Sequence, residues 1–135
     1  MDKDIDIIIY GATGFTGQLC VKYFQSLATT AKWAIAGRNQ EKLRKVAEEN
    51  LAEVEILIAD SDDEVALDNL TLRAKVILST AGPFHRYGSK LVASCVKNNT
   101  HYVDITGENF WVKGLIENHH AVSYTHLTLP TNREV

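Results

Sequence analysis

The sequence predicts an α/β fold built on a doubly wound parallel sheet with helices on both faces. Five short apolar runs alternate with segments of helical periodicity. Short connections between such elements indicate parallel strands joined by right-handed crossovers. The first apolar run leads at once into a glycine-rich turn that opens a helix. We therefore expect a three-layer domain of the Rossmann type, with strand order 3-2-1-4-5.

The individual elements follow from the local pattern. Apolar runs without polar alternation are typical of strands that are covered on both faces, and apolar residues spaced three and four apart predict the helices. Segment 62–72 is acidic and weakly periodic, so it is predicted as a helix or a turn. The expected strands are 5–10, 33–36, 54–59, 75–80 and 101–105, and the expected helices are 15–27, a helix capped by Asn39, 87–98 and 108–120.

The same spacing predicts which residues of the first and last helices face the sheet. In the first helix they are Cys20, Tyr23, Phe24 and Leu27, and in the last helix they are Phe110, Leu115 and Ile116.

Composition indicates a globular domain that works in a reducing, cytoplasmic compartment. Of the 135 residues, 45% are hydrophobic and 23% charged, with a net charge of −3. A nucleic-acid partner is not expected, because it is usually accompanied by a basic excess. No apolar run approaches the roughly 20 residues of a membrane span, and the charged start argues against a signal peptide. Cys20 and Cys95 fall on apolar helix faces and are expected to be reduced thiols.

Residues 1–121 are expected to form the domain, and residues 122–135 a separate tail. Segment 123–131 has strand-like alternation, but no element follows it as a partner. One interpretation is a non-native extension read from adjoining sequence, and the other is an edge strand that leads to a second domain. The domain is also expected to self-associate, because an apolar surface suited to a second domain would otherwise face water.

A nucleotide site is predicted at the turn between the first strand and the first helix. The spacing G-x-x-G-x-x-G gives a glycine for the sharp turn, one for the approach of a pyrophosphate and one for close packing of the helix. The free amides of the first helical turn then point at the phosphates, and two hydroxyls add hydrogen bonds. The residues assigned to this loop are Gly11, Thr13, Gly14, Phe15, Thr16 and Gly17.

The end of the second strand favours NADP(H) over NAD(H). An acidic residue there would hold the ribose 2′-hydroxyl, but this sequence has Arg38 and Asn39. A guanidinium group is suited to a bidentate contact with a 2′-phosphate. A solvated surface arginine is the alternative, but a cation at a helix start opposes the helix dipole unless an anion is nearby.

Two further strand ends carry candidate cofactor contacts. Asp60 ends the third strand, where its carboxylate is placed to accept from the adenine amine or to cap the following helix. Ala81, Gly82 and Pro83 follow the fourth strand, and their small size leaves room for a ribose and nicotinamide at the switch point of the sheet. A plain turn is the alternative for this second segment.

Four segments together resemble the N-terminal NADP-binding domain of the saccharopine dehydrogenase-like oxidoreductases, a group that includes the trans-acting enoyl reductases. The segments are Y-G-A-T-G-F-T-G at 10–17, A-G-R-N at 36–39, S-T-A-G-P-F at 79–84 and Y-V-D-I-T-G-E at 102–108. The resemblance covers residues 5 to about 120, and the last two segments make it specific.

The resemblance implies a larger enzyme with a second domain that binds a small-molecule substrate. It implies cofactor contacts at the phosphate loop, at Arg38 and Asn39, and at 81–83. It also maps Tyr102, Asp104, Gly107 and Glu108 to a segment that closes over the cofactor near the domain junction. The chain by itself is expected to be inactive, because no second domain is included.

Three other groups of residues are less convincing sites. His119, His120 and His126 lack the cysteines or spaced carboxylate of a metal site, so no metal is expected. Tyr87 and Lys90 would share a helix face, but they follow the wrong strand for the catalytic pair of short-chain dehydrogenases. Asp104 and Glu108 are interpreted either as an acid/base pair or as structural groups.

The leading hypothesis is therefore an NADP(H)-dependent oxidoreductase that transfers hydride to or from an enoyl, imine or carbonyl substrate. A non-catalytic NADP(H)-binding regulator or redox sensor is the alternative from another class, and an atypical short-chain dehydrogenase relative is a third. No residue is assigned to catalysis.

Overall fold

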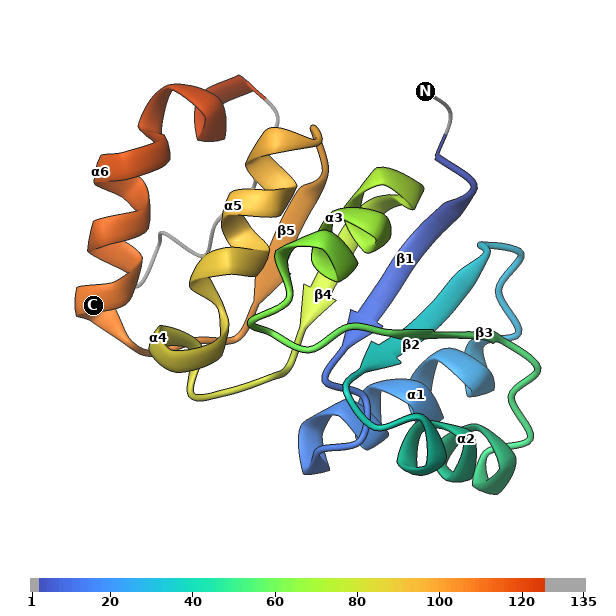
Figure 1. Ribbon diagram of the computed structural model, residues 1–135. Coiled ribbons are helices and arrows are strands. Elements are labelled where there is room, and N and C mark those ends of the chain that lie inside the picture. The colour runs from blue at the N-terminus through green and yellow to red at the C-terminus, as the bar shows by residue number, and fades with distance from the viewer. Residues whose placement is uncertain (1–2, 126–135) are drawn as a thin grey trace.

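The computed structural model describes residues 3–125 and confirms the predicted class. Five parallel strands form one sheet in the order β3-β2-β1-β4-β5 (Figure 1). Each predicted strand is correct to within one residue at either end. The strands are β1 (Ile5–Tyr10), β2 (Trp33–Gly37), β3 (Glu55–Ile58), β4 (Ala74–Ser79) and β5 (His101–Asp104).

Helices cover both faces of the sheet, which gives the expected three layers. Helices α1 and α2 pack on one face, and α3, α5 and α6 lie on the other (Figure 1). The segment that was predicted as a helix or a turn is a helix, α3. The helices are α1 (Phe15–Leu27), α2 (Gln40–Glu49), α3 (Glu64–Arg73), α4 (Phe84–Tyr87), α5 (Ser89–Lys97) and α6 (Asn109–Thr125).

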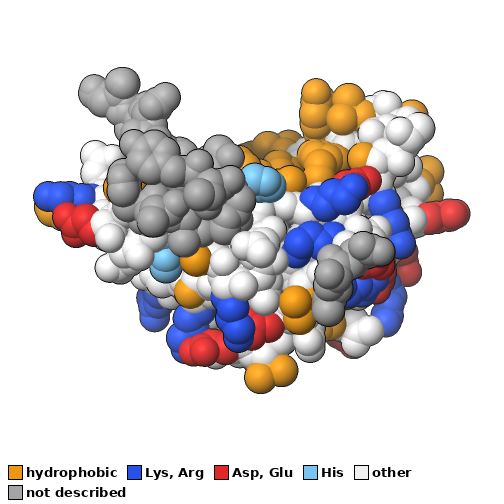
Figure 2. All heavy atoms as spheres, turned by 90° about the horizontal axis from the view of Figure 1, so that it is seen from above, with side chains coloured by type: hydrophobic (Ala, Val, Ile, Leu, Met, Phe, Trp, Pro, Cys, Tyr) orange, Lys and Arg blue, Asp and Glu red, His pale blue; other side chains and the backbone are white. Residues whose placement is uncertain are grey.

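The central strand explains why the apolar runs have no alternation. Ile8 and Ile9 are neighbours in β1 and point to opposite faces of the sheet, where each is fully buried in a different cluster of the core. Both faces of β1 therefore need apolar side chains. On the face drawn in Figure 2, acidic and basic side chains are mixed rather than segregated.

The predicted inward faces of two helices are partly wrong. Tyr23 and Leu27 are 61% and 48% exposed, whereas Cys20 and Phe24 pack against the core as predicted, together with the fully buried Val21. Phe110 is 95% exposed, since Val112 and Leu115 take the inward positions of α6.

Two helix boundaries also differ from the prediction. The expected helix 87–98 is divided at Gly88 into α4 and α5. Helix α6 continues to Thr125, past the predicted helix end at residue 120, with a non-helical backbone conformation at His119. The predictions for 126–135, including His126, lie outside the described residues. None of the described helices combines the length and apolar content needed to cross a membrane.

Candidate functional site

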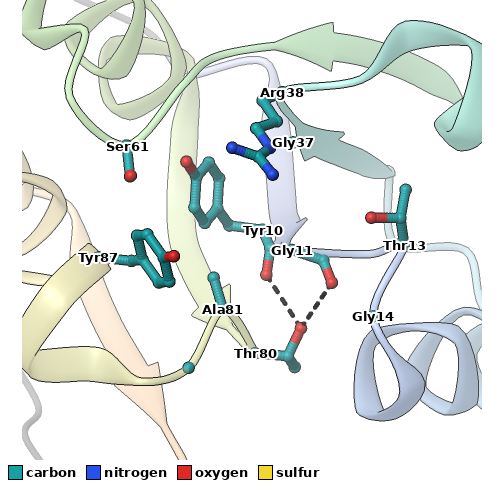
Figure 3. Close-up of a pocket in the computed structure, with 11 residues that line it drawn as sticks. Tyr10, Gly11, Thr13, Gly14, Gly37, Arg38, Ser61, Thr80, Ala81 and Tyr87 are labelled. Atoms are coloured by element: carbon teal, nitrogen blue, oxygen red, sulfur yellow. Dashed lines mark hydrogen bonds between the residues drawn. The ribbon is translucent and has the colours of Figure 1, made fainter.

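A cavity lies at the carboxyl ends of the strands, where β1 is flanked by β2 on one side and β4 on the other. Ligands of open parallel sheets bind at this switch point. Four loops supply its walls (Figure 3). The lining residues are Tyr10, Gly11, Thr13, Gly14, Gly37, Arg38, Ser61, Thr80, Ala81, Gly82 and Tyr87.

The three glycines of the phosphate loop have three different reasons to be glycine. Gly11 has a positive φ of 84°, and a Cβ on it would lie 2.9 Å from the Cβ of Ala81. A Cβ on Gly17 would lie only 2.2 Å from the carbonyl oxygen of Gly11, so the helix packs on the turn itself. A Cβ on Gly14 would meet nothing closer than 3.6 Å. The protein therefore leaves the space above Gly14 open on the side of the cavity.

The first turn of α1 has no side-chain cap, unlike that of the next two long helices. Gly14 occupies the N-cap position of α1 and makes no side-chain hydrogen bond there. By contrast, the side chain of Asn39 caps α2 and that of Asp63 caps α3. Uncapped amides at a helix start are suited to a phosphate group, which accepts hydrogen bonds and is favoured by the helix dipole.

Arg38 extends from the end of β2 toward the cavity (Figure 3). Its side chain is exposed, and no carboxylate within residues 3–125 forms an ion pair with it. Its charge is therefore available to an anionic ligand. Beside it, burial and the nearby Asp60 raise the pKa of Tyr10 to about 12, although Arg38 opposes this shift. The Tyr10 hydroxyl donates to the carbonyl oxygen of Ala59 at 3.0 Å, which fixes this wall.

Thr80 holds the ends of β1 and β4 together, a role that the sequence did not indicate. Its Oγ1 lies 3.1 Å from the carbonyl oxygens of both Tyr10 and Gly11 (Figure 3). Its amide also donates to the Tyr10 oxygen at 2.9 Å. A polar residue at the end of a buried strand was the available signal.

Half of the residues predicted for the cofactor line the cavity. The six that do are Gly11, Thr13, Gly14, Arg38, Ala81 and Gly82. The six that are not among its lining residues are Phe15, Thr16, Gly17, Asn39, Asp60 and Pro83.

For three of these six residues, contacts within the protein explain why they do not line the cavity. Gly17 is buried against the turn, as described above. The side-chain oxygen of Asn39 accepts from the amide of Lys42 at 3.0 Å. That of Asp60 accepts from the amide of Asp62 at 2.9 Å, while Asp63 is the cap of α3. The capping interpretation of Asp60 is therefore wrong, and Ser61 is the residue that lines the cavity at this strand end.

The motif at 102–108 forms a chain of hydrogen bonds that leads to the cavity wall. The Tyr102 hydroxyl donates to Asp104, the amide of Thr106 donates to Asp104 at 3.0 Å, and the amide of Glu108 donates to Thr106 Oγ1 at 3.0 Å. Glu108 then accepts from the backbone amides of Phe84 at 2.6 Å and His85 at 2.8 Å. The motif thus fastens the start of α4.

The environment of Glu108 argues against its acting as a catalytic acid. Burial by itself raises the pKa of this carboxyl, but the donors from the backbone and ring of His85 and the backbone of Phe84 outweigh it and lower the pKa. The group is therefore an ionised acceptor at neutral pH. Asp104 is buried and accepts its own hydrogen bonds, so the structural interpretation of this pair is favoured.

The remaining candidates separate in space. Tyr87 ends α4 and Lys90 belongs to α5, so the expectation that they share one helix face is wrong. Tyr87 lines the cavity, whereas Lys90 contacts Asp62 at 3.6 Å. Among residues 3–119, whose side chains the structure describes, no group of three or more histidine, cysteine or acidic residues is arranged to hold a metal ion. In the same part of the chain both cysteines are free thiols.

Fold and site together define a dinucleotide-binding domain of the Rossmann class. Residues 7–128 match the family described as the saccharopine dehydrogenase NADP binding domain, and the chain belongs to this family. NADP(H) is accordingly the cofactor of this domain.

The curated relatives with similar sequences are trans-acting enoyl reductases. The protein from Mycobacterium tuberculosis (strain H37Rv) is 39% identical over 122 residues, which are 88% of this chain and 29% of the relative. The protein from Mycobacterium leprae is 39% identical over 121 residues, 87% of this chain and 29% of its own length. This chain thus spans less than a third of the relatives it matches.

Solved structures share the fold at low sequence identity. Apo saccharopine dehydrogenase (L-Glu forming) from Saccharomyces cerevisiae aligns with a TM-score of 0.71 at 16% identity, over 93% of this chain and 26% of that one. A short-chain dehydrogenase/reductase from Vibrio parahaemolyticus aligns with a TM-score of 0.70 at 16% identity, over 91% and 81% of the two chains.

Proposed function

We propose that this chain is the cofactor-binding part of an NADP(H)-dependent oxidoreductase that reduces an enoyl compound, a carbon–carbon double bond conjugated to a carbonyl group. The single observation that carries the proposal is the position of Arg38, which has no ion-pair partner among the described residues, at the same cavity as the uncapped start of α1, in a chain of this family. The reductase names of the curated relatives support the reaction class. Imine and carbonyl compounds are the other substrates to be tested.

The residues present fit NADP(H). The pyrophosphate fits over Gly14, where a Cβ would have no close neighbour, and against the uncapped amides at Phe15 and Thr16. Thr13 lines the same side of the cavity. The 2′-phosphate fits the guanidinium of Arg38, which offers a bidentate, charge-assisted contact.

The other predicted residues are proposed to contact the remaining parts of the cofactor. Asn39 is proposed to assist through its position next to Arg38, and Asp60 is proposed to lie beside the adenine. Ala81, Gly82 and Pro83 are proposed to flank the ribose and nicotinamide.

NADPH supplies a hydride equivalent to the substrate when it is bound. The task of this chain is to bind the cofactor, orient it across the strand ends and keep its adenosine half fixed. The tie from Thr80 to the ends of Tyr10 and Gly11 keeps the floor of the site rigid. Rigid positioning is useful because hydride transfer needs the reacting atoms at roughly 3–3.5 Å.

The test is NADPH oxidation by the protein from its complete reading frame, measured with enoyl, imine and carbonyl substrates. The proposal predicts turnover with an enoyl thioester and loss of that turnover in the Gly14→Val variant. Tight NADPH binding without turnover of any of these substrates would favour a non-catalytic regulator. The 135-residue chain, assayed in parallel, is expected to bind NADPH without turnover.

A further inference from the structure

Tyr87 and Ser61 are the two cavity-lining residues that lie outside the sequence motifs. Tyr87 is the larger of the two. It is the last residue of α4, it is half-buried and it lines the cavity. Figure 3 shows its ring and hydroxyl directed into the cavity, on the same side as Tyr10 and Ser61. In the part of the chain that the structure describes, its hydroxyl has no hydrogen-bond partner, whereas the Tyr10 hydroxyl is already bound to Ala59. The Tyr87 hydroxyl is therefore free to bind a ligand.

The position of Tyr87 indicates which half of the dinucleotide it lies near. In doubly wound folds the end of the second strand binds the adenosine ribose, and the phosphate loop binds the pyrophosphate. Here Arg38 marks the adenosine side, and Thr13 and Gly14 mark the pyrophosphate side. Tyr87 faces the region next to Ser61 and Tyr10, away from Thr13 (Figure 3). Ala81 also lies beside it in this view, so the adenosine side is assigned from Ser61, which directly follows Asp60, the residue proposed to lie beside the adenine.

The structure also shows what holds Tyr87 in place. The carboxylate of Glu108 accepts from the amides of Phe84 and His85, the first two residues of α4. Trp111 stacks on Phe84 with 5.8 Å between ring centroids, and its indole nitrogen donates to Ser89 Oγ at 2.8 Å. These contacts come from the 102–108 motif and from α6, and they fix the start of α4 and the start of α5, on either side of Tyr87.

We infer that Tyr87 contacts the adenosine half of NADP(H), and that Glu108 is the residue that positions it. The inference rests on the proposed NADP(H) site and adds a contact that the glycine and arginine motifs do not contain. An aromatic ring with a free hydroxyl supplies both an apolar face for the adenine base and a donor for a ribose or phosphate oxygen. It also gives the Y-V-D-x-T-G-E motif a task, which is to set the position of the cavity wall.

The experiment measures the binding of NADPH and of 2′,5′-ADP, which represents the adenosine half alone, by calorimetry. Tyr87→Phe removes the hydroxyl and is expected to weaken both ligands about 2- to 10-fold, the usual effect of one hydrogen bond. Tyr87→Ala removes the ring as well and should weaken both by about 10-fold or more. The matched control is Tyr23→Ala, because Tyr23 is an exposed tyrosine of α1 outside the cavity.

Glu108 is tested by Glu108→Gln, with Asp68→Asn as the control carboxylate, because Asp68 accepts from Lys97 and Ser94 away from the cavity. If Glu108 acts through Tyr87, then Glu108→Gln weakens 2′,5′-ADP in the wild-type background and has no further effect in Tyr87→Ala. A purely structural role would weaken binding by the same factor in both backgrounds, and this would overturn the positioning role.

Failure of this inference is distinct from failure of the proposed function. Unchanged binding of both ligands by the Tyr87 variants, while Arg38→Ala still weakens NADPH, would overturn the inference and leave the function intact. A loss confined to NADPH, with 2′,5′-ADP unaffected, would overturn the placement at the adenosine half. No binding of NADPH by the wild type would refute the proposed function itself.

Discussion

Replacing Arg38 by alanine should turn an NADPH-selective site into an unselective one. Arg38 is exposed at the cavity and has no carboxylate partner among the described residues. The substitution therefore breaks no ion pair of the protein, and the loss falls on the ligand alone. A hydrogen bond to a charged group is worth about 1.5–3 kcal/mol. At about 1.4 kcal/mol per factor of ten, NADPH affinity should fall by about 10- to 150-fold.

Calorimetric titration of the wild type and the variant with NADPH and NADH measures this effect. NADH lacks the 2′-phosphate, so its affinity should be nearly unchanged, and the melting temperature should also stay the same. Arg44→Ala is a matched control, because Arg44 is an exposed arginine of α2 that does not line the cavity. Equal losses of affinity for NADPH and NADH would show that Arg38 does not bind the 2′-phosphate, and would refute the reasoning.

Three further predictions concern the loop and the scaffold. Gly14→Val should abolish NADPH binding, because the side chain would occupy the space proposed for the pyrophosphate. The melting temperature should stay near that of the wild type, because the nearest protein atom to the added Cβ would be 3.6 Å away. Gly17→Ala should destabilise the fold by about 1–3 kcal/mol in urea denaturation, because its Cβ would lie 2.2 Å from a backbone oxygen; unchanged stability would contradict this packing. Hydrogen bonds from Lys97 and Ser94 lower the pKa of Asp68 in the folded protein. The carboxylate therefore adds to the free energy of unfolding at pH values above its pKa in the unfolded chain, about 3.9, and this stabilisation is lost as the pH falls through the lowered pKa. The melting temperatures of the wild type and Asp68→Asn should therefore differ at neutral pH and converge in acid.

The sheet could be predicted from the sequence because its signals are local. The apolar runs of the central strands β1 and β2 report burial on both faces of the sheet, and Gly11 follows the first run directly. Strict alternation of elements then leaves few topologies open. Arg38 was found in the same way, because its position is fixed by the end of β2.

Two residues of the cavity wall, Ser61 and Tyr87, were missed, because no local motif marks them. Tyr87 lies just before the division of the predicted helix at Gly88, where the ring of Trp111 from α6 packs closely against the backbone. The helical spacing of apolar residues in segment 87–98 did not indicate that the helix is divided at Gly88.

The close packing at Gly88 yields a last prediction, that Gly88→Ala will weaken NADPH binding through Tyr87. Its backbone is in the right-handed helical region, with φ of −101° and ψ of −24°, so alanine is allowed there on backbone grounds. However, the added Cβ would lie 2.7 Å from Cζ2 of Trp111 and 2.8 Å from the carbonyl oxygen of Phe84. Either α4 or the indole must move, and α4 carries Tyr87. Gly114→Ala in α6 is the control: its Cβ would have no neighbour within 4 Å, and alanine should stabilise the helix by roughly 0.5–1 kcal/mol. Affinity for 2′,5′-ADP should therefore fall in Gly88→Ala and stay constant in Gly114→Ala, and the fall should disappear in a Tyr87→Ala background. A Gly88→Ala protein that binds 2′,5′-ADP as the wild type does would show that the position of α4 does not govern the site.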